Sequence, residues 1–309
     1  MAKTDTQFKL TNLQQEVLKL KGELAAIILA HNYQRPEVQD IADFTGDSLE
    51  LARKCVEFEA KVIIFCGVRF MAETAAILNP DSEVLLSHPD AGCPLADMIN
   101  VETLRQWKKR YPKATVVTYV NTTAAVKAES DFCCTSANGA AVTNAVPNDE
   151  IFFIPDQNLG HYISTETSKK MILYPGTCPV HDGITAEEIR AAKVNHPQSR
   201  ILVHPECRPE VIELSDAALS TSQMLRYARQ SEYKTFIIGT EEGLLHPLRQ
   251  QNPEKEFYLL SDKLICPDMK KTTLETLIQT MKTRGNIVTV PDGIGANAKR
   301  AIDRMLAIT

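Results

Sequence analysis

The chain has 309 residues, of which 44% are hydrophobic and 24% charged, a composition typical of globular proteins and not of disordered or fibrous ones. Its formal net charge of −5 argues against general binding to nucleic acids or anionic membranes, so an anionic ligand would need a local site. No apolar stretch has the length of a transmembrane helix, and the segment 1–20 lacks the apolar core of a signal peptide. We therefore expect a cytoplasmic protein with neither a membrane nor a nucleic acid as partner.

Taken in chain order, the predicted elements form one pattern that occurs three times. The first copy has an apolar strand ending at His31 and a helix opening at Ser48, and a third copy repeats both landmarks at one constant offset. A middle copy has a constant offset of its own, and in it Tyr119 takes the position of His31. The residues that match are Pro36 and Pro209, Val38, Val126 and Val211, Asp43, Asp131 and Asp216, Ser48, Ser136 and Thr221, and His31 and His204.

Each copy continues with a second apolar strand, a helix and a third strand. The second strands are expected at 62–67, 150–155 and 235–239, the helices at 70–78, 159–167 and 243–250, and third strands at 83–87 and 257–261. Continuous apolar runs between helices are typical of buried parallel strands. We therefore expect an α/β fold with three pseudo-threefold-related three-layer α/β/α units, each with a short parallel sheet, around a central active site. The expected units are 1–107 with an N-terminal helix, 108–190, and 191–309 with a C-terminal helix.

Cysteine recurs once per copy at a similar place after the third strand. The spacing from the end of the first strand to this cysteine is equal in the first and third copies and slightly shorter in the second. Cys93, Cys178 and Cys266 hold this position, and they are also the only cysteines followed by proline. Three soft thiolates on related loops favour a [4Fe–4S] cluster with one open iron acting as a Lewis acid. A zinc ion held by the three cysteines and a water is an alternative.

Polar residues follow the first strand of every copy, at positions that face the same side. Such groups can supply an acid, a base and orienting hydrogen bonds around a metal. Hydroxyl residues stand at or near the next helix starts, where they act as helix caps or bind anions, so we expect a small polyanionic substrate. The strand-end residues are His31, Tyr33, Tyr119, Asn121, His204 and Glu206, and the hydroxyl residues are Ser48, Ser136 and Thr221.

In the order and spacing of its motifs, the chain resembles the quinolinate synthase (quinolinate synthetase A) family over nearly its whole length. The resemblance implies a transferase that condenses iminoaspartate (iminosuccinate) with dihydroxyacetone phosphate to give quinolinate, phosphate and water in de novo NAD biosynthesis. An aspartate oxidase or aspartate dehydrogenase would supply iminoaspartate. The motifs cover residues 30–33, 67–74, 91–98, 119–122, 135–138, 155–160, 176–181, 204–206 and 266–274.

The resemblance also implies roles for individual residues. Cys93, Cys178 and Cys266 would hold a [4Fe–4S] cluster, and His181 would lie close to it. The expected catalytic residues are Tyr33, Tyr119, His204 and Glu206. The expected substrate-binding residues are His31, Ser48, Tyr119, Val120, Asn121, Ser136, His204, Pro205, Glu206 and Thr221.

Two alternatives stay open at this point. One is a different hydratase or lyase that uses the same cluster on a small polyanionic substrate, and the other is a zinc-binding structural protein of three repeats. Two further motifs have ordinary structural interpretations: 131–135, with adjacent Cys133 and Cys134, is expected to be a buried strand, and the glycine-rich 292–297 a turn and helix start.

Overall fold

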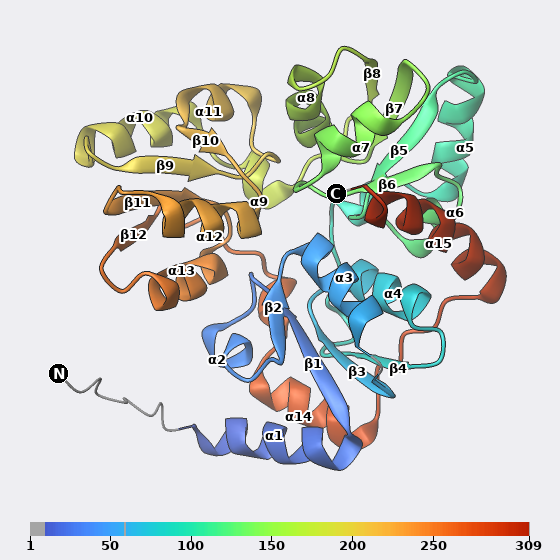
Figure 1. Cartoon of the computed structure of the whole chain (residues 1–309), viewed down its shortest axis with the longest axis vertical. Coiled ribbons are helices and arrows are strands. Elements are labelled where there is room, and N and C mark those ends of the chain that lie inside the picture. The colour runs from blue at the N-terminus through green and yellow to red at the C-terminus, as the bar shows by residue number, and fades with distance from the viewer. Residues whose placement is uncertain (1–9, 59, 309) are drawn as a thin grey trace.

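Three parallel sheets form the framework of the computed structural model, which describes residues 10–58 and 60–308. Each sheet has four strands and lies between helices, and Figure 1 shows the three units grouped around a common centre. The expected α/β fold with three α/β/α units is confirmed. Residues 1–9, part of the segment in which no signal peptide is expected, lie outside the described residues. Of the helices that the structure describes, none is both long and apolar enough to cross a membrane.

The strand order is the same in all three sheets: β2-β1-β3-β4, β6-β5-β7-β8 and β10-β9-β11-β12. The expected pattern of three strands misses the short strands β2 and β10, because two or three residues carry too little periodicity to be recognised, whereas the short strand β6 lies within the strand expected at 131–135. The strands are β1 (Ala26–His31), β2 (Phe44–Gly46), β3 (Val62–Cys66), β4 (Glu83–Leu86), β5 (Thr115–Tyr119), β6 (Phe132–Cys134), β7 (Glu150–Ile154), β8 (Lys170–Leu173), β9 (Arg200–Val203), β10 (Ala217–Ala218), β11 (Thr235–Gly239) and β12 (Glu256–Leu259).

Helices cover both faces of each sheet, and alternate strand residues face the two layers. In β1, Leu29 joins the core beneath α3 and α4, whereas Ile28 and Ala30 join the core beneath α1 and α14. The helices are α1 (Asn12–Leu24), α2 (Pro36–Gln39), α3 (Ser48–Glu57), α4 (Arg69–Leu78), α5 (Val101–Arg110), α6 (Ala124–Ala128), α7 (Gly139–Ala145), α8 (Gln157–Thr165), α9 (Pro179–Asp182), α10 (Ala186–Asn195), α11 (Pro209–Leu214), α12 (Thr221–Gln230), α13 (Leu245–Gln251), α14 (Leu274–Thr283) and α15 (Asp292–Leu306).

One hydrogen bond recurs in all three units and confirms the register of the repeat. The aspartate before the short strand accepts a bond from a backbone N–H near the start of the first strand, which ties the crossover to the sheet. The bonds run from Ile28 N to Asp43 Oδ2, from Val116 N to Asp131 Oδ2 and from Ile201 N to Asp216 Oδ2, each 2.8 Å long.

The last two helices leave the third unit and pack on the other two. Helix α14 contacts α1 and β4 of the first unit, and α15 contacts α6 and β6 of the second unit and α4 of the first (Figure 1). Ala298, Ala301, Ile302 and Met305 of α15 are buried in a core that the first two units share. The expected unit limits at 107/108 and 190/191 fall inside α5 and α10, and the division of the chain at those limits stays a prediction.

Candidate active site

A cavity lies where the three units meet, at the carboxyl ends of the strands, where parallel sheets usually bind ligands. It holds about 700 Å³ of space, including its opening to solvent. All nine polar residues singled out by the repeat line it, together with the three cysteines followed by proline. These are His31, Tyr33, Ser48, Tyr119, Asn121, Ser136, His204, Glu206, Thr221, Cys93, Cys178 and Cys266.

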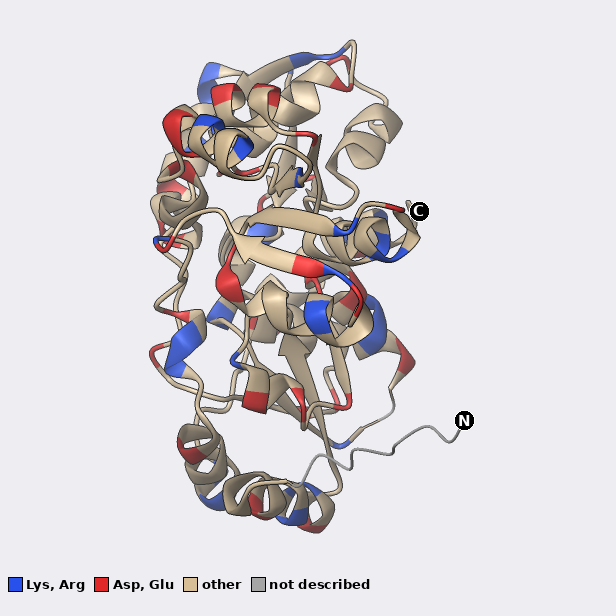
Figure 2. Ribbon diagram, turned by 90° about the vertical axis from the view of Figure 1, so that its left-hand side faces the viewer, with Lys and Arg blue, Asp and Glu red and all other residues tan. Residues whose placement is uncertain are grey.

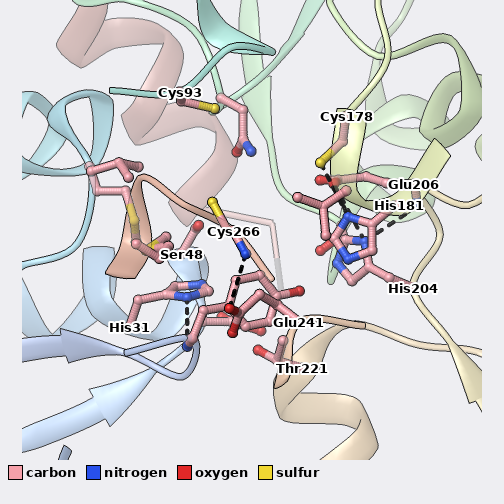
Figure 3. Close-up of a pocket in the computed structure, with 18 of the residues that line it drawn as sticks. His31, Ser48, Cys93, Cys178, His181, His204, Glu206, Thr221, Glu241 and Cys266 are labelled. Carbon is pink, nitrogen blue, oxygen red and sulfur yellow. Dashed lines mark hydrogen bonds and ion pairs between the residues drawn. The ribbon is translucent and has the colours of Figure 1, made fainter. Parts of the chain in front are cut away.

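The three cysteines reach the cavity from the loops that follow β4, β8 and β12. Figure 3 shows the sulfurs of Cys93, Cys178 and Cys266 pointing into the same space. Burial raises the pKa of the Cys93 thiol to about 12 and of the Cys266 thiol to about 11, and it raises the pKa of Cys178 well above its usual value. Neutral buried thiols are poor nucleophiles, so the set is better suited to a metal centre, whose positive charge favours the thiolate.

The remaining five cysteines do not line this cavity. All of them are buried free thiols. Cys133 and Cys134 lie in strand β6, as the sequence predicts. These five residues are Cys55, Cys66, Cys133, Cys134 and Cys207.

A continuous chain of hydrogen bonds crosses the site from the first unit to the second. The Tyr33 hydroxyl lies 2.5 Å from Thr240 Oγ1, which lies 2.8 Å from His181 Nε2. His181 Nδ1 lies 2.7 Å from Glu206 Oε2, and the Tyr119 hydroxyl donates to Glu206 Oε1 at 2.6 Å. An ionised Glu206 only accepts, so His181 Nδ1–H donates to it and, in the neutral ring, Nε2 accepts from Thr240. Thr240 then accepts from Tyr33, so the bonds run in one donor direction from Tyr33 to Glu206, and Tyr119 donates to Glu206 from the other end.

Charge at the centre of this chain is concentrated on Glu206. Burial opposes its ionisation, but the neighbouring histidines and the hydrogen bonds from His181 and Tyr119 outweigh burial and lower the pKa of Glu206. Burial, together with the Glu206 carboxylate, raises the pKa of Tyr33 and of Tyr119 well above 10. The site thus holds one buried carboxylate between two phenols that keep their protons.

His31 and His204 occupy equivalent positions and have the same local structure. In each, Nδ1 accepts from the backbone N–H two residues later, at 3.1 Å from Tyr33 N and 3.3 Å from Glu206 N. Burial lowers the pKa of both histidines to about 3, so the rings are neutral near neutral pH. A neutral ring whose Nδ1 accepts carries its proton on Nε2. Both histidines are therefore N–H donors available to a ligand.

Two helices begin at the cavity with Ser48 and Thr221, which are the first residues of α3 and α12. Their N-caps are Asp47 and Ser220, and each forms a capping box, with Glu50 and with Gln223 respectively. Ser136 also lines the cavity but precedes α7 by three residues. Helix N-termini carry unpaired backbone N–H groups and partial positive charge, which favour anions.

The cavity wall has no cationic side chain among the residues that the structure describes. None of its lining residues is Lys or Arg, although basic and acidic residues are interspersed along the outer helices (Figure 2). The lining includes the carboxylates of Asp47, Glu206 and Glu241, and also Asn121, whose buried Oδ1 has no hydrogen-bond partner. An anionic ligand would therefore depend on helix N-termini and neutral donors and not on Lys or Arg side chains.

One smaller group could also hold a metal ion. The ligand atoms of Cys178, His181 and Glu206 all lie within 4.8 Å of one another. In the described structure their contacts are hydrogen bonds, with His181 Nδ1 also 3.3 Å from Cys178 Sγ. This mixed group shares Cys178 with the three-cysteine set, so the two sets compete for the same thiol.

Residues 15–307 match the family model described as Quinolinate synthetase A protein. The chain belongs to this family. A quinolinate synthase of Methanoregula boonei is 54% identical over 296 residues, which cover 96% of this chain and 98% of the relative. A quinolinate synthase of Thermodesulfovibrio yellowstonii is 53% identical over 295 residues, covering 95% and 97% of the two chains. One from Geobacter metallireducens is 50% identical over 296 residues, covering 96% and 97%. The resemblance based on the motifs is confirmed.

Within this quinolinate synthetase A fold, two expected substrate-binding residues do not line the cavity. Val120 is packed in the hydrophobic core, and Pro205 is buried beside the site. Conversely, Thr240 and Glu241 are not among the expected site residues, although Thr240 lies within the hydrogen-bond chain and Glu241 lines the cavity. Their position directly after β11 could have identified them, because the loops that follow the middle strands lie at the same edge of the sheets as the cavity.

Proposed function

We propose that the protein is a quinolinate synthase that condenses iminoaspartate with dihydroxyacetone phosphate and releases phosphate and two waters. The observation that carries this proposal is the meeting of Cys93, Cys178 and Cys266 with the polar strand ends at one cavity. Membership in the quinolinate synthetase A family and the name shared by its curated relatives support it.

The three cysteines fit a [4Fe–4S] cluster as cofactor. They offer sulfur alone, the soft donor that such clusters prefer, and Cys93, Cys178 and Cys266 come from three separate loops around one space. When bound, the cluster would supply one iron without a protein ligand, a Lewis acid toward substrate oxygen or nitrogen. An iron with an open coordination position also suits a cavity wall that lacks Lys and Arg among its described residues and has to accept an anion.

Glu206 is the proton acceptor of the proposed reaction. It is ionised, it lines the cavity, and the donors Tyr119 and His181 hold its two oxygens in place. Tyr33 is the complementary proton donor, because its hydroxyl is protonated and hydrogen-bonded to Thr240. Together, Glu206 and Tyr33 would move the protons in the isomerisation and dehydration steps.

Substrate anions would bind to neutral donors and helix starts. The Nε2–H groups of His31 and His204 can donate to a carboxylate or phosphate, and the hydroxyls of Ser48 and Thr221 stand where backbone N–H groups of α3 and α12 are unpaired. Asn121 and Ser136 complete the set from the second unit. Neutral donors can bind an anion by hydrogen bonds alone, so no ion pair with a Lys or Arg side chain has to be broken when the product leaves.

Two further expectations follow from the proposed reaction. Iminoaspartate hydrolyses quickly, so an aspartate oxidase or aspartate dehydrogenase would have to supply it close to this enzyme. A cytoplasmic location would suit both a reduced cluster environment and this supply.

The test is an anaerobic assay that reads out quinolinate from iminoaspartate, generated in place, and dihydroxyacetone phosphate. We expect wild-type protein to form quinolinate and Glu206→Gln to lose on the order of 10²-fold in kcat with little change in KM. Glu213→Gln, an exposed carboxylate on α11 of the same unit, is the matched control and should keep full activity. An unchanged kcat in Glu206→Gln would remove Glu206 from the acid–base role.

The same preparation separates the alternatives. About four irons per chain and a broad absorbance in the visible range are expected for the cluster. Zinc without iron would favour the structural three-repeat protein, for which the group of Cys178, His181 and Glu206 offers a second set of ligands. A cluster-loaded protein that hydrates or dehydrates a small polyanion but forms no quinolinate would favour the other hydratase or lyase.

A further inference from the structure

Buried carboxylates hold the loops that carry two of the cavity cysteines. Asp156 Oδ2 accepts from the backbone N–H of Cys178 at 3.1 Å, and Glu241 Oε1 accepts from the backbone N–H of Cys266 at 3.1 Å (Figure 3 draws the second bond). Both carboxylates have no exposed surface. Each uses its other oxygen to accept from the start of the following helix, at Leu159 N and Gly243 N. The carboxylate thus ties a cysteine loop to the end of its own sheet.

The repeat shows that Asp156 and Glu241 occupy the same position in their units and make the same kind of hydrogen bond to a cysteine loop. Val68 in the first unit, Asp156 in the second and Glu241 in the third occupy equivalent positions of the repeat, because they are related by the same two offsets as the other matching residues. Val68 cannot accept a hydrogen bond from its side chain, so the first unit lacks the tie. Its cysteine loop has a side-chain tie to the third unit instead, where Asp268 Oδ1 lies 3.2 Å from the Gly92 N, next to Cys93; the same N–H also lies 2.8 Å from the Asp90 carbonyl.

Asp268 therefore joins two cysteine loops directly. It follows Cys266 by two residues and is almost completely buried. Lys271 donates to the Asp268 carboxylate at 2.7 Å and also to the carbonyl oxygen of Asp90 at 2.6 Å. The two loops are therefore connected both through Asp268 and through Lys271. Lys270 similarly connects Glu241 to the carbonyl oxygen of Tyr33.

We propose that Asp156, Glu241 and Asp268 are positioning residues for the cluster. They hold the three cysteine loops, before the cluster binds, in the arrangement that its binding requires. This inference rests on the proposed function, because it assumes that the cysteines hold a [4Fe–4S] cluster. Partners one layer outside the metal ligands orient those ligands, and their loss commonly lowers metal affinity about 10- to 100-fold.

The carboxylates also determine which groups can reach the cluster sulfurs. Each one takes up a backbone N–H at or next to a cysteine, and that N–H can then not donate to sulfur. Hydrogen bonds to the sulfurs and nearby positive charge raise the reduction potential of iron–sulfur clusters. Loss of one of these carboxylates would free an N–H and remove a negative charge beside the cluster, and both changes would raise its potential.

The test compares iron release and reduction potential in reconstituted variants. Asp268→Ala loses the tie to the Cys93 loop and should release iron to a chelator about 10- to 100-fold faster than wild type, with a more positive potential in an EPR-monitored redox titration. Asp268→Asn keeps an oxygen facing the Gly92 N–H and should release iron at close to the wild-type rate. Asp156→Asn has one oxygen for two N–H donors and should behave like Asp268→Ala.

Asp131→Asn is the matched control for the second unit, because Asp131 also accepts a backbone N–H but near the start of its strand, far from the cysteine end. It should change neither rate nor potential. Wild-type protein that holds a cluster, with Asp268→Ala and Asp156→Asn showing wild-type iron release and potential, would overturn the inference alone. Wild-type protein that takes up no iron–sulfur cluster would overturn the proposed function as well.

Discussion

Tyr119 and Glu206 belong to different units and share a hydrogen bond of 2.6 Å. Tyr119 ends the first strand of the second unit, and Glu206 follows the first strand of the third, so the bond exists only when the two units are docked. Both side chains are buried, at 4% and 3% exposure, and the phenol offsets part of the cost of burying the carboxylate. The charge state of the proposed base thus depends on how the units are assembled.

Tyr119→Phe removes this donor and should raise the pKa of Glu206. We expect the acidic limb of the pH–rate profile to move to higher pH, because the carboxylate then protonates more easily, and kcat/KM near neutral pH to fall about tenfold, because Glu206 Oε1 loses the donor that holds it in place. Tyr111→Phe, in the same unit but outside the cavity, is the control. A lower rate with an unmoved acidic limb would assign Tyr119 a role in binding only.

Thr240 should matter although it does not line the cavity. Thr240→Val keeps the shape of the side chain but breaks both hydrogen bonds, to Tyr33 and to His181, so we expect kcat to fall by about tenfold or more while KM changes little. Thr240→Ser restores the hydroxyl and should recover most of the activity. Equal activity in the Val and Ser variants would show that the chain of hydrogen bonds carries no proton that limits turnover.

Cysteine replacement should separate the cavity cysteines from the others. Cys178→Ser is expected to lose most of its iron and visible absorbance after reconstitution, because a hard hydroxyl replaces a soft thiolate. Cys207→Ser changes a buried cysteine of the neighbouring β9 loop that does not line the cavity, and it should retain iron. Iron analysis of the two proteins side by side decides the outcome, and full iron in Cys178→Ser would contradict the proposed ligand set.

The neutral histidines predict a loss of stability in mild acid. The pKa of His31 and His204 is about 3 in the folded protein and 6.5 in a solvated chain, so between these values the unfolded state binds protons that the folded state does not. Stability is therefore highest above pH 6.5 and falls as the pH is lowered, by on the order of 1 kcal/mol for each histidine between pH 7.5 and 5.5.

Urea unfolding of wild type and His31→Gln at the two pH values checks this prediction. The variant should lose on the order of 1 kcal/mol less than wild type over the interval. His161→Gln, on the exposed side of α8, serves as the control and should follow wild type. An equal loss in wild type and His31→Gln would mean that His31 is protonated in the folded protein.

The predicted and observed sites agree most closely where the repeat marks a position. Spacing and a following proline distinguish Cys93, Cys178 and Cys266 from the five other cysteines, and all three line the cavity. This works because tandem units of the same chain sample one structural position three times, and parallel strands bring their carboxyl ends to one edge. Val120 and Pro205, inferred from the family resemblance and not from the alternation of strand residues, do not line it.

The contacts between units could not be predicted in the same way. Tyr33 and Thr240 are 207 residues apart in the chain, and no local pattern pairs them. The amphipathic pattern of α14 shows that one face is buried, but not that its partner is α1 of the first unit. For the same reason Asp268, which looks like an ordinary loop residue, acquires its tie to Gly92 only in the folded molecule.

The amino-acid sequence by itself determined the three α/β units, the register between them and the cysteine and polar strand-end positions that each contributes. These depend on local periodicity, on spacing and on the geometry common to parallel sheets. Only the tertiary structure decided the hydrogen-bond chain through Thr240 and His181, the ties at Asp156, Glu241 and Asp268, and the places of α14 and α15. Those features depend on side-chain packing between distant segments, where a shift of about 1 Å removes a hydrogen bond and leaves the periodicity unchanged.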